Sequence, residues 1–257
     1  MTGFVLEASA LVKSYGPTRA LDGVALSVRA GESVAIMGAS GSGKTTLLHL
    51  LAGIVAPDSG SVAFRTAEAR VEVTALSERE RSRLRREAFG FVFQQGLLIA
   101  ELTAVENVAL ALMLNGMPRP RAEEHARGWL AALGLAGMED RRIGQLSGGQ
   151  AQRVAIARAQ VTGARVVFAD EPTGALDSAT SADVMDALLD STVGQGRTLV
   201  LVTHDPDVAA RCERIVEVRD GRIVAERAGH PASRAAGSSG ADAATADAAT
   251  ADAAVRA

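Results

Sequence analysis

The chain has 257 residues, a hydrophobic share of 47% and a formal net charge of −3. That length and composition provide a substantial core, in one large domain or two lobes. The slightly negative charge gives no general attraction to nucleic acid, and a single cysteine, Cys212, excludes a disulfide framework. The apolar stretches are too short to cross a bilayer, and we expect no secretory signal at the N-terminus.

The N-terminal part, residues 4–30 and 60–75, is predicted to be rich in β-strands, because apolar and polar residues alternate around residues 24–28. Residues 77–88 predict a solvated helix. Its arginines are interspersed with glutamates, which favours a surface of salt bridges over a patch for nucleic acid. Residues 97–160 predict mostly helix, and Trp129 is expected in the core.

Four short apolar runs predict the central sheet: Val34–Met37, Phe91–Phe93, Val166–Ala169 and Leu199–Val202. Continuous apolar strands indicate a sheet buried on both faces, which is typical of parallel strands with helices around them. The fold class predicted is therefore α/β with a mainly parallel sheet. A chemically active residue follows each run, and ligands bind beyond the carboxyl ends of such strands. We expect one site assembled from four segments.

Residues 38–45 fit the pattern G-x-x-x-x-G-K-[ST] completely, between a predicted strand and a predicted helix. The glycines let consecutive amides turn inward around phosphates. Lys44 is expected to reach the β- and γ-phosphates, and Thr45 to offer its hydroxyl to Mg²⁺. Of 27 basic residues only Lys13 and Lys44 are lysines. Lysine at position 44 supports the motif, because a compact ammonium suits a phosphate-binding loop better than a planar guanidinium does. The candidate nucleotide-binding residues here are Gly38, Ser40, Gly41, Ser42, Gly43, Lys44, Thr45 and Thr46.

A second anion site is predicted at residues 146–150, Leu-Ser-Gly-Gly-Gln, just ahead of a run with helical periodicity. Backbone N–H groups at a helix N-terminus, beside a hydroxyl, bind anions. The candidate residues are Ser147, Gly148, Gly149 and Gln150. Two phosphate-facing surfaces in one chain indicate that each nucleotide lies between the loop of one copy and this helix of another.

Catalytic candidates lie at the ends of the other strands. Asp170 is expected to hold Mg²⁺, and Glu171 to polarise the water that attacks the γ-phosphate, since neighbouring strand residues point in opposite directions. Gln94 is expected near Mg²⁺ and the water, with Gln95 as a second candidate for that place. His204 is expected to stabilise γ-phosphate charge or to position the water; the alternative is a structural histidine.

Two further residues are candidates for contact with the nucleotide or a second copy. Tyr15, the only tyrosine, offers a ring that can stack on adenine; the alternative is an aromatic residue at a strand end. Asp177 closes residues 174–177, a turn that can reach across a dimer. Residues 230–257 are rich in Ala, Asp and Thr and are predicted to form a disordered tail.

Together these residues resemble the ATP-binding subunits of ABC transporters. Residues 38–45 resemble the Walker A motif, 146–150 the signature motif and 165–171 the Walker B motif with its glutamate. Gln94 matches the Q-loop, residues 174–177 the D-loop, His204 the switch histidine and Tyr15 the A-loop. The resemblance covers about residues 4–227. It implies a domain at 1–229, with a nucleotide-binding core, an antiparallel β-subdomain and a helical subdomain at about 95–160.

The resemblance also implies partners. Two ATP molecules with Mg²⁺ are expected in a head-to-tail homodimer or heterodimer, which drives a separate membrane permease at the cytoplasmic face of the membrane. Residues 102–108 and 169–177 look like the branch with macrolide, lipoprotein and antimicrobial-peptide exporters and the cell-division ATPase. Gly96, Ala151 and Gln160 depart from its usual residues.

An alternative function is regulation of a transmembrane signalling complex without moving a solute. Soluble DNA-repair or translation ATPases are a third class, which usually show coiled-coil insertions or two cassettes, and neither pattern occurs in this sequence. A simple P-loop kinase has no use for residues 146–150. No nucleic acid partner is expected.

Overall fold

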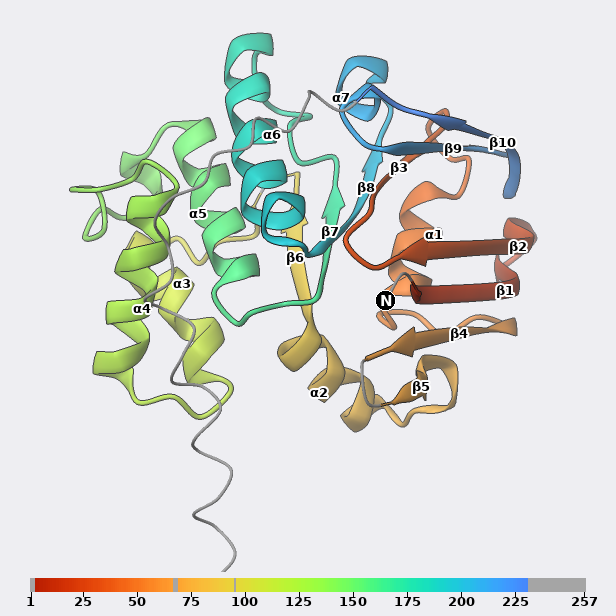
Figure 1. Ribbon diagram of the computed structural model, residues 1–257, viewed down its shortest axis with the longest axis horizontal. Coiled ribbons are helices and arrows are strands. Elements are labelled where there is room, and N and C mark those ends of the chain that lie inside the picture. Colours follow the sequence, from red (N-terminus) through yellow and green to blue (C-terminus); the bar gives the residue numbers. More distant parts are fainter. Residues whose placement is uncertain (1–2, 67–68, 95, 231–257) are drawn as a thin grey trace, which may run out of the picture.

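The computed structural model describes residues 3–66, 69–94 and 96–230. Its elements form two β-sheets flanked by helices (Figure 1). The larger sheet has six strands in the order β10-β9-β3-β8-β7-β6, and all neighbouring pairs are parallel except β10 with β9. These strands are β3 Ser33–Met37, β6 Phe89–Phe93, β7 Val166–Asp170, β8 Thr198–Thr203, β9 Arg214–Arg219 and β10 Arg222–Ala228.

The four predicted apolar strands are confirmed as β3, β6, β7 and β8, and both faces of their sheet are covered. Side chains alternate between two cores: Val34 and Ile36 of β3 pack on one face, and Ala35 packs on the other. β7 and β8 alternate in the same way. Because both faces bury apolar side chains, each strand reads as a continuous apolar run rather than an alternating one. The predicted α/β fold with a mainly parallel sheet is confirmed.

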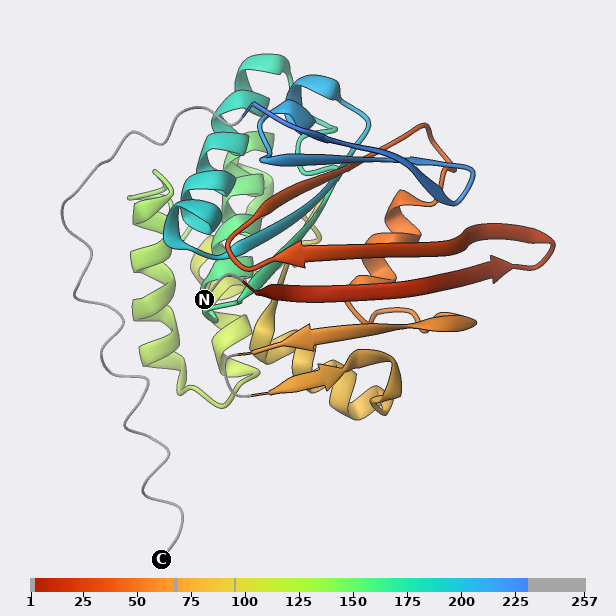
Figure 2. The same cartoon turned by 45° about the vertical axis from the view of Figure 1, so that its right-hand side comes forward.

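The smaller sheet is antiparallel, with strand order β2-β1-β4-β5. It comprises β1 Phe4–Tyr15, β2 Thr18–Arg29, β4 Ser59–Arg65 and β5 Arg70–Glu72, followed by a 3₁₀ turn at Val73–Ala75. Helix α1, Lys44–Leu51, packs between the two sheets, where Leu47, Leu48 and Leu51 are fully buried (Figures 1 and 2). This apolar core holds the N-terminus of α1 in place beneath the loop that precedes it.

Helix α2, Glu78–Ala88, has no buried residue, as the charge pattern predicted. A capping box at its N-terminus joins Ser77 and Glu80. Arg85 and Arg81 both donate to Glu78, and these hydrogen bonds lower the pKa of Glu78 to about 2. The arginines of this helix therefore serve a surface network of ion pairs.

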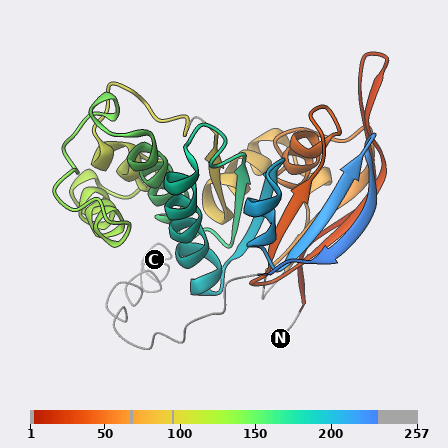
Figure 3. The same cartoon turned by 90° about the horizontal axis from the view of Figure 1, so that it is seen from above.

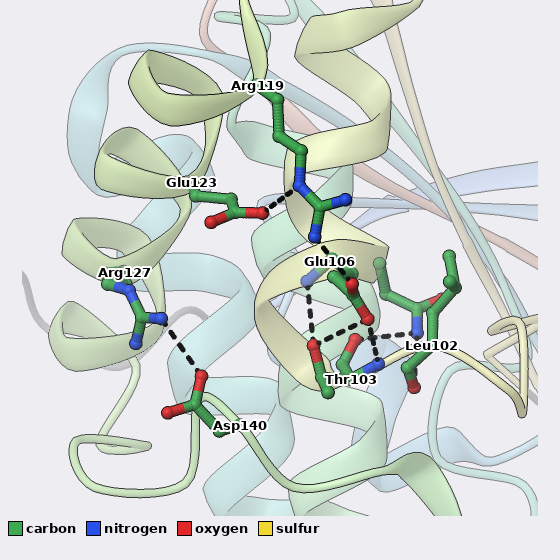
Figure 4. A network of polar contacts seen from close by, with 8 residues as sticks. Leu102, Thr103, Glu106, Arg119, Glu123, Arg127 and Asp140 are labelled. Atoms are coloured by element: carbon green, nitrogen blue, oxygen red, sulfur yellow. Dashed lines mark hydrogen bonds and ion pairs between the residues drawn. The ribbon is translucent and has the colours of Figure 1, made fainter.

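The helices α3 Ala104–Met113, α4 Arg119–Ala132 and α5 Gly148–Gln160 lie at one end of the elongated molecule, with the antiparallel sheet at the other (Figure 3). A 3₁₀ turn, Ile143–Gln145, precedes α5. Polar contacts brace α3 against α4 (Figure 4). Glu106 closes a capping box with Thr103, and Arg119 bridges Glu106 and Glu123. Arg127 pairs with Asp140 at the surface. The mostly helical region predicted here is confirmed.

Helices α6 Ser178–Thr192 and α7 Pro206–Ala210 cover the same face of the large sheet as α5, with a 3₁₀ turn at Val193–Gln195. Trp129 packs against this core with the guanidinium of Arg197 5.4 Å from its ring centre. Cys212 is buried. Within the described ranges, no helix has the length and apolarity needed to cross a membrane. The predicted tail, from residue 231 onward, lies outside the described residues.

Candidate functional site

The loop between β3 and α1 takes the shape that residues 38–45 predicted. Gly41 and Gly43 have φ of +78° and +105°, a region that only glycine enters without strain. A Cβ on Gly43 would also lie 2.4 Å from the carbonyl oxygen of Ala20. Any other residue at position 43 would push the loop away from β2. The loop therefore needs glycine here for both backbone conformation and space.

The loop offers polar groups that suit a phosphate chain. Nζ of Lys44 lies 2.8 Å from the carbonyl oxygen of Gly38 and 2.9 Å from that of Ala39, and donates to both. The hydroxyl of Ser42 is buried and has no hydrogen-bond partner in the described residues. A buried ammonium held only by neutral carbonyls, beside an unsatisfied hydroxyl, fits an anionic ligand.

Thr45, in the first turn of α1, contacts Asp170 at the end of β7. The hydroxyl of Thr45 donates to Oδ1 of Asp170 across 3.3 Å. Burial is the main factor that raises the pKa of Asp170, and the negative charge of Glu171 acts in the same direction. A hydroxyl and a desolvated carboxylate at this spacing are hard oxygen ligands of the kind Mg²⁺ takes.

The protein supplies few other candidate ligands here. No group of three or more His, Cys, Asp and Glu side chains able to hold a metal occurs within residues 3–66, 69–94 and 96–230.

The carboxylate of Glu171 contacts His204 and Thr203. Its Oε1 lies 2.8 Å from Nδ1 of His204, and its Oε2 accepts a hydrogen bond from the Thr203 hydroxyl. Strand alternation was expected to separate the two carboxylates, but β7 ends at Asp170 and Glu171 has φ of +48°. Glu171 therefore has a left-handed backbone conformation and does not continue the pleat of β7. Such a conformation costs on the order of 1–3 kcal/mol and persists where the surroundings hold it.

A pocket of about 620 Å³ lies at the carboxyl ends of β3, β7 and β8. Among the predicted site residues it brings together Ser40, Gly41, Gly43, Lys44, Thr45, Thr46, Glu171 and His204. A second pocket, of about 440 Å³, flanks the loop on the β9 side and is lined by Gly38, Ser42 and His204 among others. The sequence predicted this convergence because parallel strands end at one edge of the sheet.

The predicted residues Ser147–Gln150 do not line this pocket. Ser147 is the N-cap of α5: its Oγ accepts from the N–H of Gln150, whose side-chain oxygen accepts from the N–H of Ser147. Ser147 and Gly148 are exposed, whereas Gly149 is buried against Thr180 of α6. The helix thus presents its N-terminus to solvent, away from the phosphate loop of its own chain.

Four other predicted residues also lie outside the lining of these two pockets: Asp170, Gln94, Asp177 and Tyr15. Gln94 follows β6, and a Cβ built on Gly174 would lie 3.0 Å from its Nε2 and 3.5 Å from the Cβ of Glu171. Asp177 is the N-cap of α6 and accepts from the N–H of Thr180. Tyr15 ends β1 and is 50% exposed, with Nζ of Lys13 5.7 Å from its ring centre. Gln95 lies outside the described residues.

Some neighbours of the site went unpredicted. His49 on α1 is half-buried, and burial lowers its pKa while the charge of Asp170 opposes that shift. Gln152 and Arg158 of α5 bond to the backbone on both sides of Gln94. For these residues, the only signal in the sequence was a polar side chain on an otherwise apolar helical face.

Residues 21–174 match the protein family described as ABC transporter. The chain belongs to the ABC transporter family. The match spans the phosphate loop, the signature residues and the end of β7. This chain is an ABC-type ATPase, an ATP-binding cassette.

Curated relatives of this ABC cassette include exporters. The pyoverdine export ATP-binding/permease protein PvdT of Pseudomonas aeruginosa is 49% identical over 239 residues, covering 89% of this chain and 35% of that protein. The macrolide export ATP-binding/permease protein MacB of Hyphomonas neptunium is 46% identical over 230 residues, covering 88% of this chain and 35% of that protein. The chain thus spans about a third of the length of these relatives.

A solved structure shares the ABC fold. The dimeric post-hydrolysis structure of the ATP-binding cassette MJ0796, bound to ADP and Pi, has a TM-score of 0.78 and 38% sequence identity. The match covers 87% of this chain and 98% of that one. A cassette of the same family therefore superposes over nearly its whole length.

Proposed function

We propose that two copies of this cassette enclose two ATP molecules head to tail and use their hydrolysis to drive a membrane permease of the exporter branch. One observation carries the proposal: the exposed N-terminus of α5, where the sequence predicts an anion site, does not line the pocket of its own phosphate loop. A second copy in the opposite orientation would supply it. The dimeric state of the similar cassette MJ0796 supports this arrangement.

In the proposed site, Lys44 leaves the carbonyls of Gly38 and Ala39 for the phosphate oxygens of ATP. Thr45 and Asp170 hold Mg²⁺, with Gln94 as a further ligand. The ion, when bound, neutralises charge that develops on the phosphates. Tyr15 stacks on the adenine ring, and Asp177 contacts the second copy.

Glu171 acts as the general base in this proposal. Its carboxylate accepts the proton of the water that attacks the γ-phosphate. His204 holds Oε1 of Glu171 from one side and Thr203 holds Oε2 from the other, so the carboxylate is oriented before ATP binds. His204 also stabilises charge on the γ-phosphate.

The permease is proposed to dock beside α3. A groove of about 550 Å³ lies where α2, β6 and the helical end of the molecule meet, and Phe91, Leu97 and Leu114 contribute apolar surface to it. Leu97 and Leu114 are among the large apolar side chains exposed in this protein. An apolar groove next to Gln94 suits a partner that has to sense the nucleotide. This docking would place the cassette at the cytoplasmic face of the membrane.

The test is the mass of Glu171→Gln with and without Mg²⁺ and ATP, measured by light scattering on the full chain. Removing the base should leave a species that binds ATP, hydrolyses it slowly and doubles its mass from 26.5 kDa. Glu171→Gln with Ser147→Arg is the matched control, expected to stay a single copy. A single copy of Glu171→Gln at saturating ATP would refute the shared site.

Docking to a permease is tested separately, by purifying the tagged full chain from membranes and identifying by mass spectrometry the proteins that accompany it. A multi-spanning permease that is lost with Leu114→Asp supports the docking groove. A permease retained by that variant would contradict it.

A further inference from the structure

A cleft of about 460 Å³ lies at the amino ends of β3, β7 and β8, whereas the phosphate loop follows the carboxyl end of β3. The start of β1 and the end of β4 also line it. Three arginines, Arg65, Arg165 and Arg197, belong to its lining, and no acidic residue does among the described ones. We call this site the arginine cleft. It shares no lining residue with the pocket of the phosphate loop.

Two of the three guanidinium groups have no carboxylate partner in the part of the chain that the structure describes. Arg165 is exposed, and its side chain makes no hydrogen bond or ion pair there. Arg197 donates to the backbone carbonyl and the side-chain oxygen of Gln160, both neutral, and burial lowers the pKa of its guanidinium. Arg65, by contrast, pairs with Glu7 at 3.1 Å. A carboxylate in the cleft would supply the countercharge that Arg165 and Arg197 lack.

Hydrogen bonds between loops hold the arginine cleft in shape. The Gly31 N–H donates to the hydroxyl of Thr198 across 3.0 Å, and the Thr198 N–H donates to the carbonyl oxygen of Arg165 across 3.1 Å. Small residues such as Ala164 and Gly196 complete the lining. The cleft therefore suits a short acidic side chain carried on a backbone of small residues.

A segment of the same chain has that chemistry. Residues 231–257 lie outside the described residues, and between positions 241 and 254 their sequence repeats Ala-Asp-Ala-Ala three times. The repeats contain Asp242, Asp247 and Asp252 and no basic residue. Each aspartate lies between alanines, which add little bulk around the carboxylate. The charge of the repeats is thus opposite to that of the arginine cleft.

The last described residues place the start of this segment near the cleft. The Gly229 N–H donates to the carbonyl oxygen of Glu213, whose own N–H donates to the hydroxyl of Ser33. Ser33 begins β3, two residues after Gly31 of the cleft lining. Asp242 follows Gly229 by 13 residues, a length of chain that spans up to about 43 Å. All three repeats therefore have enough chain to reach the cleft.

We propose that the aspartate repeats at 241–254 dock in the arginine cleft of their own chain, with a carboxylate bound to Arg165 and Arg197. Tethering within one chain gives an effective concentration of about the millimolar level, and three equivalent repeats raise it further. Because the attraction is between charges at the surface, salt should release the segment. This inference does not depend on the shared ATP site, since it uses none of that site's residues.

Paramagnetic relaxation measured on the full chain without ATP tests the docking. A nitroxide label is attached to Thr245→Cys, because the one natural cysteine, Cys212, is buried in the native protein. At low salt the label should broaden the ¹⁵N-amide signals of Gly163 and Gly196, which line the cleft. The signal of Gly16, beyond the far end of β1, should stay sharp. At about 1 M salt, where the Debye length is about 3 Å, the broadening should be lost.

Two variants each remove one side of the contact. Arg165→Gln should abolish the broadening, and so should replacement of the three aspartates by asparagine. The same spectra show whether each variant is folded. Arg127→Gln, which changes a surface arginine of α4 paired with Asp140, is the matched control and should keep the broadening (Figure 4).

Broadening that both variants lose and the control keeps supports the docking. Broadening that survives in either variant, or that is absent from the labelled parent at low salt, overturns it. A mixture of ¹⁵N chain without the label and labelled chain without ¹⁵N identifies the source of the repeats. Equal broadening in the mixture would assign the contact to a second copy and overturn docking within one chain. Because no ATP is present, failure here leaves the proposed ATP-driven pairing untouched.

Discussion

Nδ1 of His204 lies 2.8 Å from Oε1 of Glu171, so the residues after two neighbouring strands form a direct pair. β7 and β8 are parallel, with Asp170 opposite Val202, which places the two strand ends side by side. The left-handed turn at Glu171 then aims its carboxylate at the imidazole. The proposed base is therefore oriented by the fold itself.

His204→Ala should lower kcat for ATP hydrolysis about 10²-fold or more, because a general base loses its orienting partner. ATP binding should change little, since the loop residues remain. Steady-state kinetics and equilibrium binding of ATP give the two quantities. His125→Ala on the exposed surface of α4 is the control and should behave as the wild type. A kcat for His204→Ala within twofold of wild type would exclude this role.

Lys44→Ala should weaken ATP binding about 10- to 100-fold, since a hydrogen bond to a charged group contributes about 1.5–3 kcal/mol. Lys44→Arg should also weaken it, because a planar guanidinium does not replace a compact ammonium as the point charge that the loop presents to the phosphates. Titration calorimetry measures both dissociation constants. An unchanged constant for Lys44→Ala would show that the loop does not hold the phosphates.

Gln160→Leu should destabilise the fold. Gln160 is fully buried, donates to the hydroxyl of Thr192 and accepts from Nη1 of Arg197. Leucine would remove the donor to Thr192 and the side-chain acceptor of Arg197, which keeps only the backbone carbonyl of residue 160. The expected cost is about 1–3 kcal/mol in the free energy of unfolding. Urea denaturation measures the free energy of unfolding, and Gln195→Leu, at an exposed position, is the control. Equal or greater stability of Gln160→Leu would mean that this polar cluster adds nothing to the core.

Cys212 should resist alkylation in the native protein. Burial raises the pKa of its thiol to about 12, so at pH 8 almost none of the reactive thiolate is present. Relative to a thiol of ordinary pKa, the thiolate fraction falls about a thousandfold. Iodoacetamide labelling followed by mass spectrometry should be slow until urea unfolds the chain. Equal labelling rates in native and unfolded protein would contradict the buried state.

The sequence predicted the parts of the site that depend on short stretches of chain. The loop at 38–45, the apolar runs and the polar residues after them each lie within one strand–turn–helix unit. The Glu171–His204 pair was not predicted, because it depends on which strands are neighbours and on the backbone of Glu171.

Contacts made by α5 also escaped prediction. Gln160 stood out as a departure from the related branch, but its partners, Thr192 and Arg197, lie more than 30 residues further along the chain. The hold of Arg158 on Gly96 and Leu97 spans about 60 residues and follows from packing of α5 against β6. Periodicity places a residue on a helical face and does not say which backbone that face meets.

In the proposed pair, each ATP is shared by two copies, and a crystal structure of Glu171→Gln with Mg²⁺ and ATP would test this sharing. We predict that Oγ of Ser147 from the second copy lies about 3 Å from a γ-phosphate oxygen held by Lys44. A triphosphate enclosed by one copy alone, with Ser147 of every copy remote from it, would contradict the account.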